Sequence, residues 1–363
     1  MRIHFPKVDC TSRYAGAELT QNDTLFLKGI ALVLLLLHHL FYEQTGLYDD
    51  WMIHGTGLVQ TIGNYAKLCV AIFVFLSGYG VAKSLQGGGR LLAFYGKRFT
   101  KLYLNYWFIW LLFVPVGIFV FGRTLSEAYA GESVGLCLLL DWLGLSNSFL
   151  RSGYNITWWF YSCILLLYLL APLLDKVARR FPLVGLVGAW LFMEFCRVEW
   201  IVGPIRFYLF PFLLGMVCAH KHWISFGADW SRKHRGLALL ILLTTLFLRT
   251  NWGLRADGLL ALEGAILIQS YQRQGGGKLS RALQYVGRHS FNIFLFHTFL
   301  YYYYFESWIF WSRNPLLIFL TLLVSSLLIS IGIEWIKERI GFYTLQDRII
   351  RSLDRKPLCQ AYE

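Results

Sequence analysis

Residues 24–42 read TLFLKGIALVLLLLHHLFY, and this stretch decides the fold class of the chain. A helix that spans a bilayer needs about 20 mostly apolar residues, because the hydrocarbon core is about 30 Å thick. This run has the required length, yet it contains Lys28, His38 and His39. The stretch therefore predicts a transmembrane helix that carries titratable side chains at a depth where they are costly.

The same apolar pattern recurs along the chain. Ten stretches satisfy it: 24–42, 67–86, 102–121, 156–174, 182–197, 204–219, 236–250, 256–272, 286–305 and 314–335. A further apolar run, 134–147, is shorter and carries Asp141, and it is predicted to be an interfacial or re-entrant segment on the outer side. The pattern predicts an all-α polytopic membrane protein with about ten spans.

Composition supports one lipid-embedded unit. Of the 363 residues, 56% are hydrophobic and 15% are charged, whereas soluble domains contain about 25% charged residues. So few charges cannot cover a water-facing surface of this size. We therefore expect a membrane domain over 24–335, with cytoplasmic tails at 1–23 and 336–363.

The formal net charge of +13 would suggest a nucleic-acid partner in a soluble protein. In a membrane protein, a surplus of Lys and Arg in cytoplasmic segments accounts for it better. With the N-terminus inside and ten alternating spans, inner segments hold 25 of the 34 Lys and Arg residues and outer segments hold 8, with Lys28 inside the first span. The bias predicts that both termini are cytoplasmic, and no nucleic-acid partner is expected.

Lys28 and His39 are predicted to share one face of the first span. Eleven residues are about three helical turns, or roughly 16 Å, which puts Lys28 near the inner edge and His39 in the outer half. His38 points about 100° away. Lys28 can extend to the inner headgroups, but His39 has no such route. It is either satisfied by a hydroxyl of a neighbouring helix or serves as a neutral general base, since imidazole titrates near working pH.

Other costly polar groups lie in later spans. His297 falls near mid-depth of span 286–305, either in a structural hydrogen bond or as part of a site. Glu194 and Glu263 either pair with an arginine of a neighbouring helix, such as Arg206, or are protonated in place.

Two further patterns lie at the membrane boundaries. Arg98 and Lys101, three residues apart, share a face of a helix that enters from the inside, and either hold lipid headgroups or cradle the phosphates of a cytosolic donor. Ser77-Gly78 ends the second span and permits close approach of a helix or a ligand. Trp158 and Trp159 either anchor their helix at the interface or stack on a sugar.

Together these segments resemble the acyltransferase-3 family, integral-membrane acyltransferases that modify bacterial surface carbohydrates. The matching segments occur in family order: Lys28-Gly29-Ile30-Ala31 through His39, Phe73–Tyr79, Arg98-x-x-Lys101, Thr157–Phe160 up to Tyr168 and Pro172, Arg206–Gly215, and Val286-Gly287 to His297. Lysine replaces the more common arginine at Lys28 and at Lys101, which keeps the charge but loses a two-pronged contact.

The resemblance implies transfer of an acyl group, usually acetyl, from acyl-CoA to a hydroxyl of a glycan or lipid-linked sugar. It implies a multi-pass protein of the bacterial cytoplasmic (inner) membrane, in contact with membrane lipids and without a metal. On this basis His39 is the predicted general base and Lys28 contacts the inner end of the donor. The remaining assignments are Arg98, Lys101, Ser77 and Tyr103 for acyl-CoA, and His297, Trp158 and Trp159 for the acceptor.

Three alternatives remain at this stage. A secondary transporter of a small polar or sugar-like solute would also have about ten spans and buried His and Glu, although no paired Gly/Pro-interrupted spans are found in the two halves. A structural or sensory protein would leave the shared face of Lys28 and His39 unexplained. A second family of membrane O-acyltransferases carries its histidine late in the chain and fits the first span less well.

Overall fold

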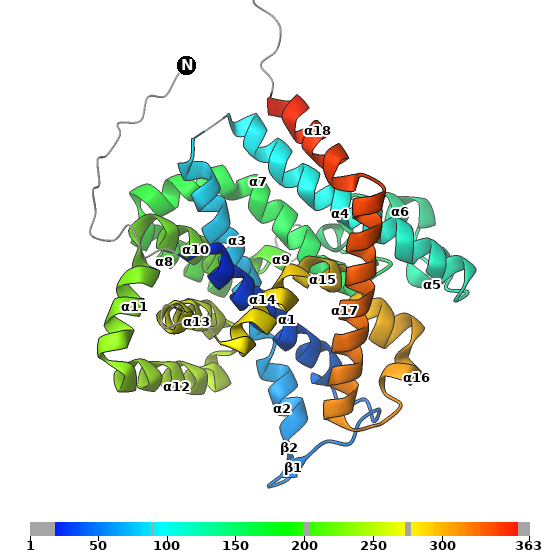
Figure 1. Ribbon diagram of the computed structural model, residues 1–363, viewed down its shortest axis with the longest axis horizontal. Coiled ribbons are helices and arrows are strands. Elements are labelled where there is room, and N and C mark those ends of the chain that lie inside the picture. The colour runs from blue at the N-terminus through cyan, green and yellow to red at the C-terminus, as the bar shows by residue number, and fades with distance from the viewer. Residues whose placement is uncertain (1–18, 89, 199–202, 273–276, 355–363) are drawn as a thin grey trace, which may run out of the picture.

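The computed structural model describes residues 19–88, 90–198, 203–272 and 277–354 (Figure 1). Within these ranges the chain is almost entirely helical, apart from a short hairpin of β1 (Met52–Ile53) and β2 (Thr56–Gly57). The α-helices are α1 Gln21–Phe41, α2 Leu58–Tyr65, α3 Leu68–Gln86, α4 Leu91–Phe119, α5 Leu125–Ala128, α6 Val134–Trp142, α7 Trp159–Arg180, α8 Pro182–Phe195, α9 Gly203–Arg206, α10 Leu209–Lys221, α11 Trp223–Lys233, α12 Arg235–Trp252, α13 Asp257–Gln272, α14 Lys278–Arg288, α15 Ser290–Thr298, α16 Glu306–Ile309, α17 Pro315–Arg339 and α18 Phe342–Asp354.

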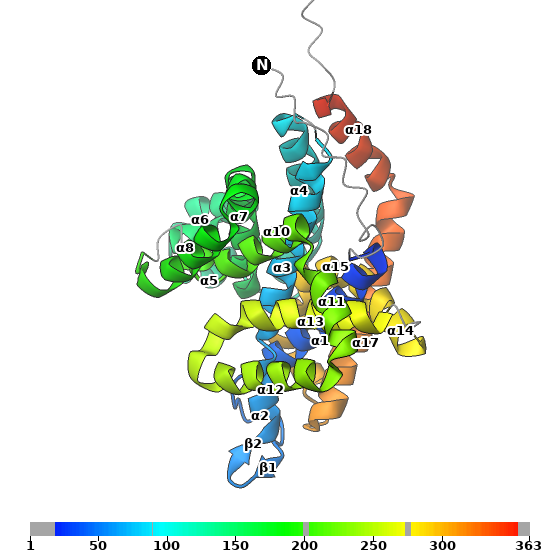
Figure 2. The same ribbon diagram turned by 90° about the vertical axis from the view of Figure 1, so that its left-hand side faces the viewer.

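The prediction of an all-helical membrane protein is confirmed. Six helical segments of the described chain are long and apolar enough to cross a membrane: Gln21–Phe41, Leu58–Gln86, Leu91–Phe119, Ile156–Arg180, Arg235–Tyr271 and Pro315–Arg339. Two shorter apolar helices, α8 and α10, coincide with further predicted spans. The segment Arg235–Tyr271 contains two helices, α12 and α13, which lie side by side in Figure 2. The number of ten crossings and the orientation remain predictions.

The first helix begins where the sequence supplies a capping box. Thr20 Oγ1 accepts from the Asp23 amide at 3.1 Å, and Asp23 Oδ2 accepts from the Thr20 amide at 2.9 Å. These bonds satisfy backbone donors that the first helical turn leaves without partners. The helix therefore starts three residues before the predicted span and runs without interruption past Lys28 and His39.

Glycines set a close helix crossing between α3 and α10. A Cβ atom on Gly78 would lie 2.0 Å from the carbonyl oxygen of Phe212, and one on Gly215 would lie 2.1 Å from that of Phe75. Any side chain at either position would separate α3 from α10. The small residues after Ser77 therefore serve close helix contact, which was one of the two predicted roles.

A second glycine contact joins α1 to α14. A Cβ atom on Gly29 would lie 2.0 Å from the carbonyl oxygen of Leu283, and one on Gly287 would lie 1.9 Å from that of Leu25. The small-residue turn beside Lys28 is thus the place where α14 meets the first span. This contact leads the chain into α15, which carries His297.

The segment predicted to be re-entrant forms α6, a helix of 9 residues that lies beside α4. Side chains of α4 satisfy the backbone carbonyls at its C-terminal end, which the helix itself leaves free. The donors and acceptors are Tyr106 Oη to Asp141 O at 2.5 Å, Trp107 Nε1 to Trp142 O at 2.8 Å and Tyr103 Oη to Leu143 O at 3.0 Å. Nine residues span about 14 Å, which agrees with a segment that does not cross.

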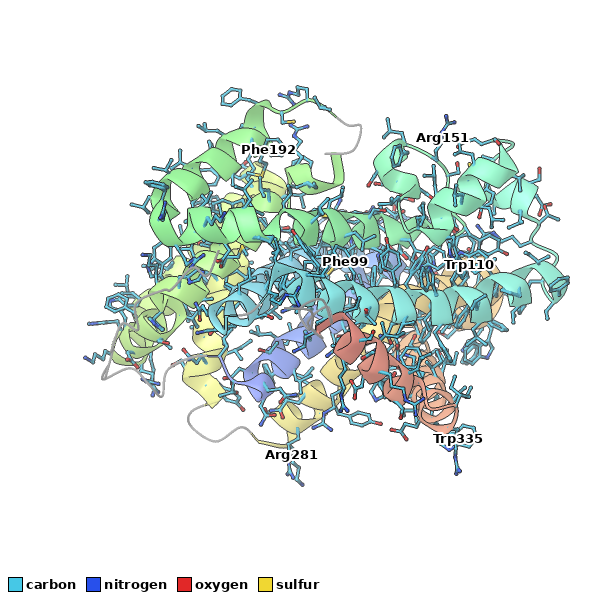
Figure 3. The ribbon with its side chains drawn as sticks, turned by 90° about the horizontal axis from the view of Figure 1, so that it is seen from above. Phe99, Trp110, Arg151, Phe192, Arg281 and Trp335 are labelled. Carbon is cyan, nitrogen blue, oxygen red and sulfur yellow. The ribbon has the colours of Figure 1, made fainter. Side chains whose placement is uncertain are left out.

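The region predicted to be a C-terminal tail contains helical structure over its described residues, 336–354. The last span continues to Arg339, and α18 then turns back to lie against α4, as Figures 1 and 3 both show. Lys337, which the prediction assigned to the tail, is fully buried. Its Nζ donates to Asn105 Oδ1 and Asn292 Oδ1, each at 2.8 Å, and to Glu334 Oε1 at 3.1 Å.

The two glutamates singled out in the spans have different partners from the one suggested. Glu194 forms an ion pair with Arg255 rather than with Arg206. Glu263 Oε1 accepts from Thr245 Oγ1 at 2.7 Å. The Arg206 Nε donates to the Met193 carbonyl at 2.8 Å. Both carboxylates therefore have local structural partners.

Candidate active site

A cavity of about 630 Å³ lies at the C-terminal end of α1, between α1, α3, α7, α9 and the segment after α15. We call it the His39 cavity. Its polar lining residues are His38, His39, Tyr42, Glu43, Thr45, Lys67, Asn147, Thr157, Trp159, Arg206, Tyr208, Tyr301, Tyr302 and Glu306. A narrow apolar neck of about 20 Å³ adjoins it and is lined by Leu35, Phe73, Phe160 and Phe294 in addition to His39 and Trp159.

His39 lies at the junction of the His39 cavity and this neck. Its ring centroid is 5.0 Å from that of His297 and 6.0 Å from that of Tyr301. No hydroxyl of a neighbouring helix bonds its imidazole within the described part of the chain. A ring held by aromatic neighbours and facing a cavity keeps a nitrogen lone pair for a ligand.

His297 is fully buried on α15. Its Nδ1 lies 3.0 Å from the carbonyl oxygens of Ile293 and Phe294, so we assign the proton to Nδ1 and the lone pair to Nε2. Nε2 has no hydrogen-bond partner among the described residues. In this tautomer, His297 Nε2 can accept a hydrogen bond from an N–H group of the neighbouring His39 ring. Such a bond would fix the orientation of the His39 ring.

The chain leaves α15 through a π-helical turn, Phe299–Tyr304. Such turns are rare and are frequent at functional sites. This one carries Tyr301, whose ring also lies 5.9 Å from that of His297. The run of tyrosines from Tyr301 to Tyr304 is typical of an aromatic belt at a membrane interface, and the sequence gives no sign of a π turn.

His38 differs from its neighbour in having a backbone partner. Its Nδ1 lies 2.9 Å from the carbonyl oxygen of Gly63 on α2. His38 was predicted to point about 100° away from His39 around the helix, and this direction explains why it has a different partner. Its ring still lines the His39 cavity. The two adjacent histidines therefore have different surroundings.

Lys67 and Arg206 were given no catalytic role from sequence, yet both line the His39 cavity. Lys67 directly precedes α3, and Arg206 ends α9 with its guanidinium 5.0 Å from the Phe207 ring centroid. Two cations beside an imidazole can stabilise negative charge that develops on a reacting oxygen. The only sequence signal was their position at the outer ends of predicted spans, which many residues share.

The two tryptophans have separate environments. Trp158 is 4% exposed, and its Nε1 donates to the Leu295 carbonyl at 2.9 Å, so it anchors its helix in the core. Trp159 stacks on Tyr208 with centroids 5.5 Å apart and lines both the His39 cavity and the neck. Of the pair, only Trp159 lines the His39 cavity, whereas both tryptophans line a smaller neighbouring cavity of about 290 Å³.

The predicted donor residues lie away from this cavity. The Arg98 Nη2 donates to the Gly80 carbonyl at 2.8 Å, and its guanidinium lies 5.6 Å from the Tyr168 ring centroid. Lys28 is close enough to Arg98 for the two charges to interact, whereas Lys101 is exposed.

Two other predicted donor contacts have structural surroundings. Tyr103 bonds α6 through its hydroxyl, and Ser77 is half-buried beside the α3–α10 glycine contact. Neither the His39 cavity nor its neck is lined by any of the five predicted donor residues. We therefore carry Lys28, Arg98 and Lys101 forward as donor candidates and assign Tyr103 to the support of α6.

This fold and this cavity define a multi-pass helical membrane protein with a pair of neighbouring imidazole rings at one cavity. Within the described residues, no group of three or more His, Cys, Asp or Glu side chains is arranged to hold a metal ion. The sequence model of the acyltransferase-3 family, described as "Acyltransferase domain", matches residues 26–335, and the chain belongs to this family.

A curated relative is the acyltransferase MdmB of Streptomyces mycarofaciens, with 26% identity over 159 residues. That match covers 43% of this chain and 39% of the relative, so the chain spans well under half of that protein. No solved structure matches the chain at a significant level. The family is described by its acyltransferase domain, and an acyltransferase acts on an acyl donor and an acceptor.

Proposed function

We propose that the protein transfers an acyl group, in the first instance acetyl, from acyl-CoA to a hydroxyl of a cell-surface carbohydrate or lipid-linked sugar. The reaction takes place in the bacterial cytoplasmic membrane. The observation that carries the proposal is the His39 imidazole, which faces a cavity of about 630 Å³ beside His297 without a hydrogen bond of its own in the described chain.

In this proposal the acceptor hydroxyl binds in the His39 cavity and gives its proton to His39. The sugar oxygen then bonds to the acyl carbonyl carbon, the carbon–sulfur bond breaks, and the CoA thiolate takes up the proton. Proton removal from a sugar hydroxyl at neutral pH requires such a positioned base. Lys67 and Arg206 share the cavity and are the candidates for stabilising the oxyanion.

The acyl end of the donor would reach His39 through the apolar neck, whose lining of Leu35, Phe73 and Phe294 suits an acyl chain rather than a charged group. Lys28 stands about three turns nearer the inner edge on the same helix. Together with Arg98 it would contact the donor from that side, and Lys101 would meet the CoA phosphates at the water boundary.

The direct test is transfer of label from radiolabelled acetyl-CoA to an envelope glycan fraction, in membranes with and without the protein. Loss of the acetyl mass from the same glycans in cells that lack the gene supports the same conclusion. Uptake of a solute without any dependence on acyl-CoA would favour the transporter alternative instead.

Lys101→Ala is expected to raise KM for acetyl-CoA by roughly tenfold, because a charge-assisted hydrogen bond contributes about 1.5–3 kcal/mol. The effect should grow as salt is lowered, since ions screen exposed charges, and Lys101→Arg should retain activity. Lys97→Ala, an equally exposed cation on α4, is the matched control. Arg98 is less suitable for this test because it also holds the Gly80 carbonyl. An unchanged KM would remove Lys101 from the donor site.

Orientation gives a separate prediction. Single cysteines at the exposed positions Thr45 and Leu150 should react with a membrane-impermeant maleimide added outside intact cells, whereas those at Arg90 and Arg179 should not. The expectation follows from the Lys and Arg bias and from a non-crossing α6. Labelling at Arg179 from outside would mean that the 134–147 segment crosses the membrane.

A further inference from the structure

A second cavity, of about 290 Å³, adjoins the His39 cavity and has no assigned role. The two share Asn147, Ile156 and Trp159 as lining residues. Most residues that line the second cavity are polar. They come from the loop after α4, from α6, from the segment before α7, from α7 itself and from the π-helical turn: Arg123, Asp141, Ser146, Arg151, Ser152, Asn155, Ser162 and Tyr303. Arg151 stands at its rim and is labelled in Figure 3.

Asn155 brings a buried donor to this cavity. Its side chain is 2% exposed, and its Oδ1 accepts from both the amide and the hydroxyl of Thr157, at 2.9 and 2.8 Å. These two bonds fix the orientation of the amide, because only an oxygen can accept them. The Nδ2 group is left without a partner among the described residues, and a buried donor in that state is costly.

Arg123 brings a second unpaired donor and a charge. Its guanidinium lies between two tyrosine rings, 3.6 Å from the centroid of Tyr303 and 4.3 Å from that of Tyr154. The Tyr154 hydroxyl also donates to the Arg123 carbonyl at 3.0 Å, which fixes the backbone. Nη1 is buried and has no hydrogen-bond partner in the part of the chain that the structure describes. The two rings restrict the guanidinium and leave Nη1 as its unpaired nitrogen among the described residues.

The other charges of this cavity are already satisfied. Arg151 pairs with Glu132 at 2.8 Å and is 46% exposed. Burial raises the pKa of Asp141 to about 6, and its carboxylate accepts from the Tyr154 amide at 3.2 Å and from the hydroxyls of Tyr129 and Ser146. Hydrogen bonds satisfy the Asp141 carboxylate without removing its charge, so what the lining residues offer beyond it is two unpaired N–H groups and the positive charge of Arg123.

We propose that this second cavity is an acceptor subsite for an acidic sugar, whose carboxylate accepts hydrogen bonds from Arg123 and Asn155. The inference rests on the proposed function and names the class of acceptor: an anionic glycan with its acidic group one residue away from the acylated hydroxyl. Trp159, which lines both cavities, would stack on the sugar between them. Arginine forms two-pronged, charge-assisted bonds with carboxylates, and these give specificity as well as affinity.

The test measures binding without any acyl donor. The purified protein is placed in phosphatidylcholine nanodiscs, which avoid sugar-based detergents, and titrated with glucose, glucuronic acid and glucuronic acid methyl ester by tryptophan fluorescence and calorimetry. Glucuronic acid is expected to bind about tenfold more tightly than its methyl ester, which matches it in shape but lacks the charge. Equal affinities, or no binding of any of the three sugars, would overturn the proposal.

Variants assign the preference to this cavity. Arg123→Gln should remove it, and so should Asn155→Asp, which keeps the Thr157 bonds but replaces the free donor by a negative oxygen. The control is Arg151→Gln combined with Glu132→Gln, which removes an ion pair beside the same cavity without changing the net charge. A preference that survives both Arg123→Gln and Asn155→Asp would overturn the assignment.

Two further arms separate the remaining sources of failure. If phosphatidylglycerol in the nanodisc competes with glucuronic acid and this competition requires Arg123, the cavity holds a lipid phosphate and the proposal fails. If acetyl transfer proceeds equally well to neutral and acidic glycans, the subsite proposal fails while the proposed function stands. If acidic sugars bind as expected but no acetyl is transferred, the binding site stands and the acyltransferase proposal is the one that fails.

Discussion

His39→Gln is expected to lower the rate of acyl transfer by about 10²–10⁴-fold, the contribution of a positioned general base. Glutamine keeps a polar side chain of similar length in the His39 cavity but cannot take up a proton at neutral pH. Folding should be preserved, because His39 makes no hydrogen bond within the described chain and its neighbours are rings that tolerate an amide. The measurement is label transfer from acetyl-CoA in membranes, normalised to the amount of inserted protein.

His38→Gln is the matched control for this prediction. It changes the adjacent histidine in the same helix, which lines the same cavity but bonds the Gly63 carbonyl. A glutamine amide can keep that bond, so activity should fall far less than in His39→Gln. Equal losses in the two variants, or full activity in His39→Gln, would remove the general-base assignment.

The amino-acid sequence predicted the features that depend on a single helix. Residues 24–42 gave the first span, and the eleven-residue spacing put Lys28 and His39 on one face, because helical periodicity is a local property. The small residues Ser77 and Gly78 indicated a close approach in the same way, although the sequence did not name Gly215 as the partner. The family resemblance, on six short segments in order, agreed with the family match over residues 26–335.

Contacts between helices that are distant in the sequence could not be predicted from one sequence. The periodicity of span 286–305 gives the depth of His297 but does not say that its ring lies 5.0 Å from that of His39. Lys67 and Arg206 looked like ordinary residues at the ends of spans. The second cavity depends on how the loop at Arg123 folds over Tyr154 and Tyr303, and loops carry no periodic signal.

The largest stability effect outside the site is expected at Lys337. This residue joins α4, α15 and α17 through Asn105, Asn292 and Glu334, and its Nζ lies 5.3 Å from the ring centroid of Phe342 on α18. Removing one partner of a buried ion pair costs about 3–5 kcal/mol, because the other partner stays buried without compensation. The Glu334 side chain is 32% exposed and accepts a hydrogen bond from Tyr343, so we expect a cost at the lower end of this range.

Lys337→Met, which keeps the length of the side chain, should therefore lower the thermal unfolding temperature of the purified protein by roughly 5–10 °C. Arg339→Met is the matched control, because it removes the same charge two residues later from an exposed position over the ring of Trp335. It should change the unfolding temperature by about 1 °C or less, as surface substitutions usually do. Equal shifts in the two variants would mean that the Lys337 network contributes little.

A double substitution distinguishes a lost ion pair from lost packing. If the cost of Lys337→Met comes from an uncompensated Glu334 carboxylate, adding Glu334→Leu should recover part of the lost stability, since an apolar pair can replace a buried ion pair at little cost. If the cost comes from packing against Phe108 and Phe342, the second substitution should add its own loss instead.

Because α18 packs on α4, limited proteolysis after Asp354 should also become faster in Lys337→Met. Recovery of protection in the double variant would assign the anchoring of α18 to the ion pair.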